Sequence, residues 1–101
     1  MARRLFDDAV LLRLRGVPLE VVLDALDCHV SKDQAFVPVK AQRTERWFVS
    51  AGPGVTELLV TGLKWFDASE GKGGGGGIDL VIHLLQLSFV DAVKRLTAAG
   101  L

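Results

Sequence analysis

Hydrophobic positions in the first quarter of the chain repeat with a helical period. Residues 5–14 mix apolar and charged side chains as a short amphipathic helix does, and Gly16 is its predicted C-cap. Pro18 suits the first turn of a second helix, running to about Asp27, because an N–H would have no helical partner there. The apolar stripe of this second helix has the spacing i, i+3, i+4, i+7 and consists of Leu19, Val22, Leu23 and Leu26.

From Cys28 onward, short segments rich in Phe, Val, Trp and Leu replace the helical pattern. They cover residues 34–40, 45–50, 55–60 and 63–66, with turn-forming residues at 31–33, 52–54 and 61–62 between them. The Gly-Pro-Gly turn at 52–54 should join two antiparallel neighbours. Pro38 should confine the first segment to a sheet edge, because proline donates no ladder hydrogen bond. The pattern predicts three or four antiparallel strands in meander order.

A glycine tract follows the last predicted strand. Gly71 and residues 73–77 have no side chains, and ordering such a run loses much backbone entropy, so we expect a loop. Leu87 and Ser88 separate two further predicted helices, and Ser88 followed by Asp91 is typical of an N-cap with an acidic N3 residue. The first of these helices has apolar residues at helical spacing, namely Ile78, Val81, Ile82 and Leu85.

These elements predict an α+β fold in which a small antiparallel sheet is flanked by an N-terminal and a C-terminal helix pair. The 101 residues suit a single domain, residues 1–101, with one modest core. No uncharged apolar run reaches the length of about 18 residues that a membrane span needs. Residues 1–4 carry charge, but no apolar signal segment follows them before Asp7. We therefore expect a soluble cytoplasmic protein.

Charge and side-chain chemistry exclude several functions. Twelve basic and twelve acidic residues cancel, so any affinity for nucleic acid must come from a local face. Cys28 is the only cysteine, and His29 and His83 are the only histidines, which excludes an intrachain disulfide and a zinc site with four Cys/His ligands. Asp79 and His83, four residues apart, suit a local hydrogen bond better than a shared metal. No catalytic constellation and no cofactor site is predicted, and Cys28 should be buried beside a surface histidine.

The glycine tract leaves two interpretations open. A Walker A loop is excluded, because Gly71-Lys72 has Phe66 at the position of the first glycine and Gly73 after it. A GxGxxG pattern at 71–76 carries no weight, since a glycine run satisfies any glycine pattern. The amides of Gly73, Gly75 and Gly77, with Lys72 nearby, could contact a nucleic-acid phosphate. Alternatively, the tract is a flexible connector, and Asp79 only complements the helix dipole.

Aromatic and basic residues alternate in two of the predicted strands. Together they could form a platform on which bases of single-stranded DNA stack while cations hold the backbone. Strand alternation allows at most one ring of each adjacent aromatic pair to be exposed, because the other must point into the core. The residues concerned are the pairs Trp47-Phe48 and Trp65-Phe66 and the cations Arg43, Arg46, Lys64 and Lys72.

The C-terminal third carries a resemblance to a known family. Lys-Trp-Phe at 64–66 is followed by Gly-Gly-Gly-Ile-Asp-Leu at 75–80 and by Leu-Ser-Phe-Val-Asp-Ala-Val at 87–93. In this order the segments resemble the N-terminal zinc-ribbon domain of bacterial DnaG-type DNA primases and of related plasmid and phage primases. In register with that family, Ala68 and Gly71 stand at the second ligand pair, and Val37 and Lys40 stand near the first.

The resemblance implies a metal-free variant of the ribbon, stabilised by packing in place of zinc. The residues expected to supply that packing are Phe36, Trp47, Leu58, Trp65 and Phe66. The resemblance also implies a non-catalytic module that helps a primase, or another replication or mobilisation protein, engage single-stranded template. The polymerising site would then lie in a separate domain. The alternative is a docking or dimerisation module for a replication partner, with the aromatic residues as an apolar patch. A nucleotide-binding enzyme would have to bind its ligand at residues 71–77.

Overall fold

One antiparallel sheet forms half of the molecule. The computed structural model describes residues 6–38, 43–52 and 54–101, so Leu5, residues 39–40 of the first predicted strand and Pro53 lie outside the described residues. In the described part the sheet has five strands in chain order, which makes the fold α+β. The strands are β1 (His29–Lys32), β2 (Glu45–Ala51), β3 (Gly54–Thr61), β4 (Lys64–Asp67) and β5 (Lys72–Gly75).

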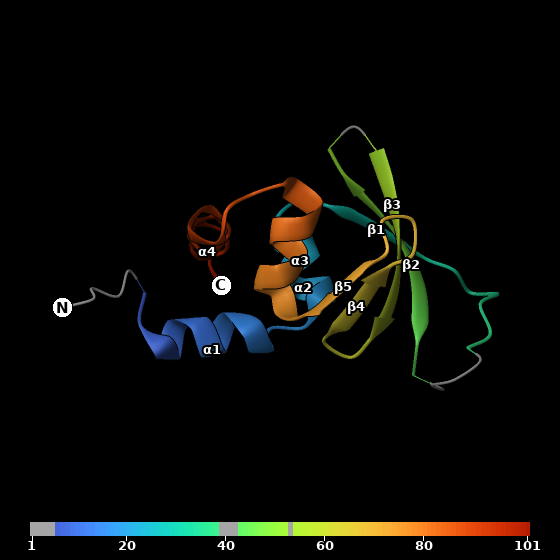
Figure 1. Cartoon of the computed structure of the whole chain (residues 1–101), viewed down its shortest axis with the longest axis horizontal. Helices are drawn as coiled ribbons and strands as arrows, with labels where there is room; N and C mark the ends of the chain where they lie inside the picture. The colour runs from blue at the N-terminus through green and yellow to red at the C-terminus, as the bar shows by residue number, and fades with distance from the viewer. Residues whose placement is uncertain (1–5, 39–42, 53) are drawn as a thin grey trace.

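Helices cover one face of this sheet. They are α1 (Asp8–Gly16), α2 (Leu19–Ala25), α3 (Gly76–Leu85) and α4 (Phe89–Ala98). The helix α2 packs on β1, and α3 packs on β4 and β5, whereas α1 and α4 pack on the far side of α3 (Figure 1). Each predicted helix pair therefore divides, with one member on the sheet and one in an outer layer. Among the described residues no helix lies on the opposite face, which we call the outer face.

Two apolar clusters follow from these layers. The first lies between the sheet and the helices α2 and α3, and consists of Leu19, Leu23, Trp47, Val49, Leu58, Val60, Trp65 and Leu80. The second joins the helices to one another, and consists of Leu14, Val22, Ile78, Val81, Ala92, Val93 and Leu96. In β2 and β3 the buried side chains, Trp47 and Val49 and then Leu58 and Val60, are two residues apart, as expected for strands with one covered face.

The helix termini largely follow the sequence signals. Asp7 caps α1 by accepting the N–H of Ala9 at 2.9 Å, and Ser88 caps α4 by accepting the N–H of Asp91 at 3.1 Å. Gly16 is the last residue of α1, not its cap, and Pro18 is the N-cap of α2. The predicted hairpins at 52–54 and 61–62 are confirmed by the register of β2, β3 and β4.

The first strand lies earlier in the chain than predicted. Residues 29–32 form β1, and no strand occurs in the described residues 34–38. The reason is Asp33, whose carboxylate accepts the N–H of Ala35 at 3.0 Å while its carbonyl accepts the N–H of Phe36 at 3.3 Å. This turn directs the chain out of the sheet after Asp33, whose own N–H still donates to the carbonyl of Arg46 at 2.8 Å.

The glycine tract is the main correction to the predicted fold. It forms the edge strand β5 and the first turn of α3, not a loop. A Cβ atom at Gly74 would lie 2.9 Å from Cζ2 of Trp65, and one at Gly77 would lie 2.7 Å from Cγ2 of Val22. The backbone of Gly76 has φ +83°, a value that L side chains rarely adopt. Close packing of neighbouring side chains therefore orders a segment that has little strand propensity of its own.

Candidate nucleic-acid interface

A buried carboxylate organises the turn between β4 and β5. Asp67 is 2% exposed, and its Oδ1 atom accepts the N–H groups of Ser69 at 3.0 Å and Glu70 at 3.2 Å. Its backbone carbonyl accepts the N–H of Gly71 at 2.8 Å. The other carboxylate oxygen, Oδ2, lies 2.7 Å from Nε2 of His83 on α3. One side chain thus closes the turn 67–71 and ties it to a helix, and its burial is offset by hydrogen bonds to both oxygens.

His83 has a different partner from the one predicted. It pairs with Asp67 and stacks on Trp65 at a ring-centroid distance of 4.9 Å, whereas Asp79 accepts the N–H of Gly75 through Oδ2 at 3.3 Å. The predicted contact between Asp79 and His83 is therefore wrong. Among the described residues no group of three or more His, Cys, Asp or Glu side chains is placed to hold a metal ion.

A groove of about 630 Å³ opens between β5 and α3, next to this pair. Its lining combines a cation, a carboxylate and apolar side chains, and consists of Trp65, Lys72, Gly73, Asp79, Ile82, His83, Gln86 and Leu87. The indole N–H of Trp65 is buried and has no acceptor among the described residues. Three of these lining residues, Trp65, Lys72 and Gly73, come from β4 and β5. The groove thus lies along the hairpin formed by these two strands, residues 64–75, which we call the β4–β5 hairpin.

The free edge of β5 faces this groove at Gly73. The N–H of Gly76 donates to the carbonyl of Leu63 at 2.8 Å, so these two residues are a hydrogen-bonded pair of the antiparallel ladder. Because such pairs alternate with unbonded ones, the backbone groups of Gly73 and Gly75 point away from β4. Asp79 takes the N–H of Gly75, whereas the N–H and carbonyl of Gly73 are at the open edge.

An exposed ring and two cations accompany this open backbone. Phe66 is 43% exposed, points to the outer face, and lies so close to Gly73 that a Cβ atom there would be 3.1 Å from its Cδ1 atom. Lys64 and Lys72 are exposed. Neither ammonium group forms an ion pair with any of the described residues.

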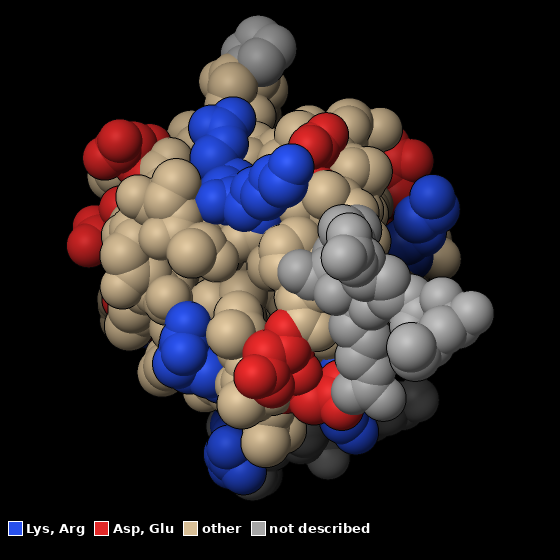
Figure 2. Space-filling view, turned by 90° about the vertical axis from the view of Figure 1, so that its left-hand side faces the viewer, with Lys and Arg blue, Asp and Glu red and all other residues tan. Residues whose placement is uncertain are grey.

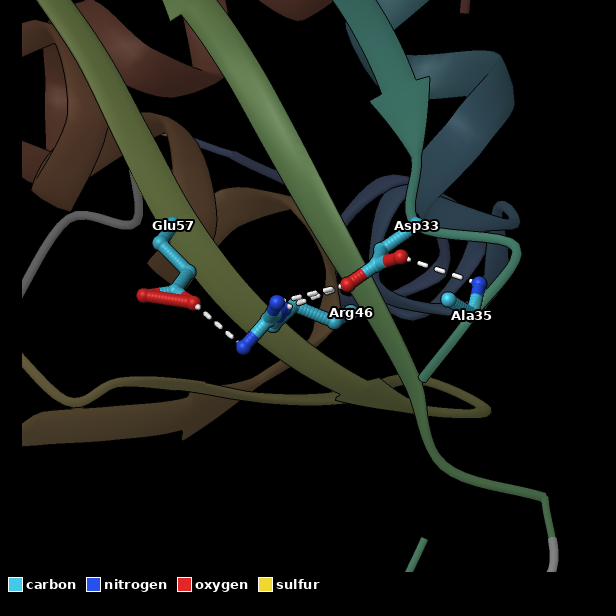
Figure 3. Close-up of polar contacts among 4 residues, drawn as sticks. All are labelled: Asp33, Ala35, Arg46 and Glu57. Atoms are coloured by element: carbon cyan, nitrogen blue, oxygen red, sulfur yellow. Dashed lines mark hydrogen bonds and ion pairs between the residues drawn. The ribbon is translucent and has the colours of Figure 1, made fainter. Parts of the chain in front are cut away.

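Arg46 occupies the middle of the outer face, but acidic groups already hold it (Figure 3). Its Nη2 and Nε atoms lie 2.6 Å and 3.0 Å from Oδ2 of Asp33, and Nη1 lies 3.3 Å from Oε1 of Glu57. The guanidinium is also 5.7 Å and 5.5 Å from the ring centroids of Phe36 and Phe48. Arg46 therefore ties the turn after β1 to β2 and β3, and its charge is neutralised within the fold.

The structure corrects several of the predicted contact residues. Trp47 and Trp65 are only 4% and 5% exposed, so their rings fill the core and cannot serve as stacking platforms. Their neighbours Phe48 and Phe66 take the outer face, as strand alternation requires. Phe66 is accordingly not part of the core that was expected to replace zinc, and neither is Phe36, which is half-buried beside the Arg46 guanidinium. Arg43 is exposed next to the turn at Gly62.

Of the three glycine amides predicted to contact phosphate, the structure leaves one open. The N–H of Gly75 is engaged by Asp79, and Gly77 is buried against Val22, so neither offers an open amide. Only Gly73 keeps one. Sequence reasoning missed Asp67, although its position two residues after Trp65 on the same strand face signals a carboxylate that points inward.

Cys28 and His29 show no sign of reactive pairing. Cys28 is half-buried and His29 is exposed. Burial raises the pKa of the Cys28 thiol, and the neighbouring Asp27 carboxylate adds to this effect while Arg95 opposes it. A raised thiol pKa disfavours the thiolate that a nucleophile needs.

Charges at the end of the molecule opposite to the sheet do not form one large patch. At the end of the molecule farthest from the sheet, acidic and basic side chains form small separate groups with uncharged surface between them (Figure 2). No single helix of the described residues is long and apolar enough to cross a membrane, and α3 and α4, which together have that length and composition, meet at 108°. Comparison with protein families, with curated proteins and with solved structures finds no match.

Proposed function

We propose that the chain is a non-catalytic module that binds single-stranded DNA through the β4–β5 hairpin. The observation that carries this proposal is the exposed ring of Phe66 beside the open backbone of Gly73, with Lys64 on the same face of the hairpin and Lys72 on its helix face. Neither lysine forms an ion pair with the described residues. A base can stack on the ring, and the cations and a backbone N–H can donate hydrogen bonds to phosphate oxygens. Phe66 thus takes the role that the sequence assigned to Trp65.

We further propose that the domain is a metal-free variant of the primase zinc ribbon. The turn 67–71 holds Ala68 and Gly71, which align with a ligand pair of that family. The Asp67 carboxylate supports this proposal, because it joins the turn to α3 through hydrogen bonds, a link that a bound ion could otherwise supply. On this view the chain serves a bacterial, plasmid or phage primase or replication protein in the cytoplasm.

A titration of the whole chain with a fluorescein-labelled oligothymidylate tests DNA binding. Stacking contributes about 1–3 kcal/mol per base, so Phe66→Ala should weaken binding by roughly 5- to 150-fold. Val55→Ala is the matched control, because Val55 is 66% exposed but lies on β3, away from Gly73. Absence of binding by the unsubstituted chain at low salt, or equal affinity of the two variants, would refute the proposal.

A second candidate function, docking to a replication partner, is favoured by the outer face of the sheet. Arg46, Leu59 and Phe66 lie side by side across β2, β3 and β4, and the charge of Arg46 is balanced by Asp33 and Glu57. Such a face is apolar at its exposed rings, and one guanidinium with two carboxylates leaves a net charge of −1 at its centre. Docking predicts an affinity that changes little with salt, whereas DNA binding predicts a steep decrease.

A further inference from the structure

The opposite edge of the sheet, β1, also has unpaired backbone groups. The N–H of Asp33 donates to the carbonyl of Arg46 at 2.8 Å, which makes these two residues a hydrogen-bonded pair. Since bonded and unbonded pairs alternate, the N–H and carbonyl groups of Val30 and Lys32 point away from β2. No backbone hydrogen bond from the described residues reaches these groups. An open edge of this kind is a template for a further strand.

A groove of about 470 Å³ runs along this edge. Its lining comes from α2 and β1, and consists of Glu20, Val21, Asp24, Cys28, His29 and Val30. Val21 is 46% exposed and gives the groove an apolar floor. Glu20 and Asp24 stand one helical turn apart on the same face of α2, and Asp24 forms no ion pair with the described residues.

Within the chain, a basic side chain from β1, Lys32, already binds a carboxylate of α2. It projects from β1 toward the helices, and its Nζ atom lies 3.2 Å from Oε2 of Glu20. A strand added outside β1 would lie about 4.8 Å further out and would project alternate side chains in the same direction. A basic side chain from that strand would meet the next carboxylate, Asp24, while its aliphatic stem covered Val21.

We propose that β1 and α2 form a docking site for an extended basic peptide segment of a partner protein, which adds to the sheet as a sixth strand. The backbone groups of Val30 and Lys32 supply main-chain hydrogen bonds, and the Asp24 carboxylate selects Lys or Arg at the position that faces α2, since Glu20 is already paired with Lys32. The site lies at the edge opposite to the β4–β5 hairpin, so it does not depend on the proposed DNA binding.

The test is a nuclear magnetic resonance titration of the whole chain with a synthetic peptide of alternating Thr and Lys. The amides of Val30 and Lys32 should shift and exchange more slowly with solvent, and Asp24→Lys should weaken binding about tenfold or more, as repulsion replaces attraction. Glu70→Lys is the matched control, because it makes the same charge change at an exposed position on the β4–β5 turn. Its affinity should stay within about twofold of the unsubstituted chain.

Two further peptides separate main-chain pairing from charge alone. The same peptide methylated on the backbone nitrogens that face β1 should lose its affinity, and a peptide of alternating Thr and Glu should not bind. Equal binding of the methylated peptide, equal effects of Asp24→Lys and Glu70→Lys, or shifts confined to β5 would overturn the proposal. So would shifts at Val30 and Lys32 that only an oligonucleotide produces, because the occupant would then be a nucleic acid.

Discussion

His83 on α3 and Asp67 at the end of β4 are joined by a 2.7 Å contact in the interior of the protein. It connects a helix to a tight turn across sixteen residues of sequence, and the Trp65 indole, stacked on the His83 ring, supports it from one side. The pair therefore fixes the position of the β4–β5 hairpin, which carries the proposed contact residues.

Removal of the Asp67 carboxylate should destabilise the whole domain. Asp67→Ala leaves the His83 ring and two backbone N–H groups without an acceptor, and we expect the free energy of unfolding to decrease by about 2–4 kcal/mol. Urea denaturation followed by circular dichroism measures this change. Glu70→Ala, at an exposed position on the same turn, should change the free energy by less than about 0.5 kcal/mol. A loss below that value for Asp67→Ala would show that the carboxylate does not hold the turn.

Two glycines of the tract should respond in opposite ways to alanine. A Cβ atom at Gly77 would overlap Val22, so Gly77→Ala should cost about 1–3 kcal/mol despite the higher helix propensity of alanine. No atom lies within 4 Å of a Cβ atom at Gly75, whose φ is −140°, so Gly75→Ala should be neutral or stabilise by up to about 1 kcal/mol. Thermal or urea unfolding distinguishes the two, and an identical response would indicate a tract without specific packing.

Lys72 should contribute to DNA affinity through charge. Each phosphate contact to a single strand adds about 0.7 to the slope of log affinity against log salt, so Lys72→Ala and Lys64→Ala should each reduce that slope by this amount. Lys94→Ala serves as the reference, since Lys94 is an exposed cation on α4, remote from the sheet. If Lys94→Ala reduced the slope as much as Lys72→Ala, the salt dependence would come from the overall charge of the protein and not from contacts on the hairpin.

Arg46 should matter for stability more than for DNA binding. Its ion pairs are partly exposed, so Arg46→Met, which keeps the aliphatic stem, should lower the free energy of unfolding by about 1 kcal/mol. The salt dependence of oligonucleotide binding should stay unchanged, because this guanidinium is already neutralised. If the slope decreased as it should for Lys72→Ala, Arg46 would have to exchange its carboxylate partners for phosphate.

The Cys28 thiol should react slowly. Its pKa is raised in the folded state, so at mildly alkaline pH iodoacetamide should modify the folded chain more slowly than the urea-unfolded chain. Because the folded pKa lies above the unfolded one, the associated stability is present below the unfolded pKa of about 8.5 and is lost as pH rises through the folded value. Equal rates in both states would contradict this prediction.

Local signals in the sequence sufficed for much of the fold. The turn residues at 52–54 and 61–62 locate the hairpins of β2, β3 and β4, and Ser88 locates the start of α4. These features depend on backbone conformations that only a few residue types favour. The edge strands were not predictable in this way. β1 is short and largely polar. β5 consists of a lysine and three glycines, and Trp65 on the neighbouring strand leaves no space for a Cβ atom at Gly74.

The candidate site was predictable only in part. Alternation showed that one ring of each aromatic pair must be buried, but it did not tell which. Trp47 and Trp65 are buried because they share a sheet face with Leu58 and Val60, a relationship set by the register between strands. The partners of Arg46 are Asp33 and Glu57, which lie thirteen and eleven residues away in the chain, so no local sequence pattern indicates these ion pairs.

The close contact between Gly77 and Val22 means that the size of a neighbouring side chain limits which residue can occupy position 77. A smaller residue at position 22 would open space for a methyl group at 77, so the two substitutions Val22→Ala and Gly77→Ala should cost less together than the sum of each alone. Among related sequences, the two sites should therefore change in concert. The glycine at position 77 would then be subject to the same steric constraint on substitution as a side chain in a packed core.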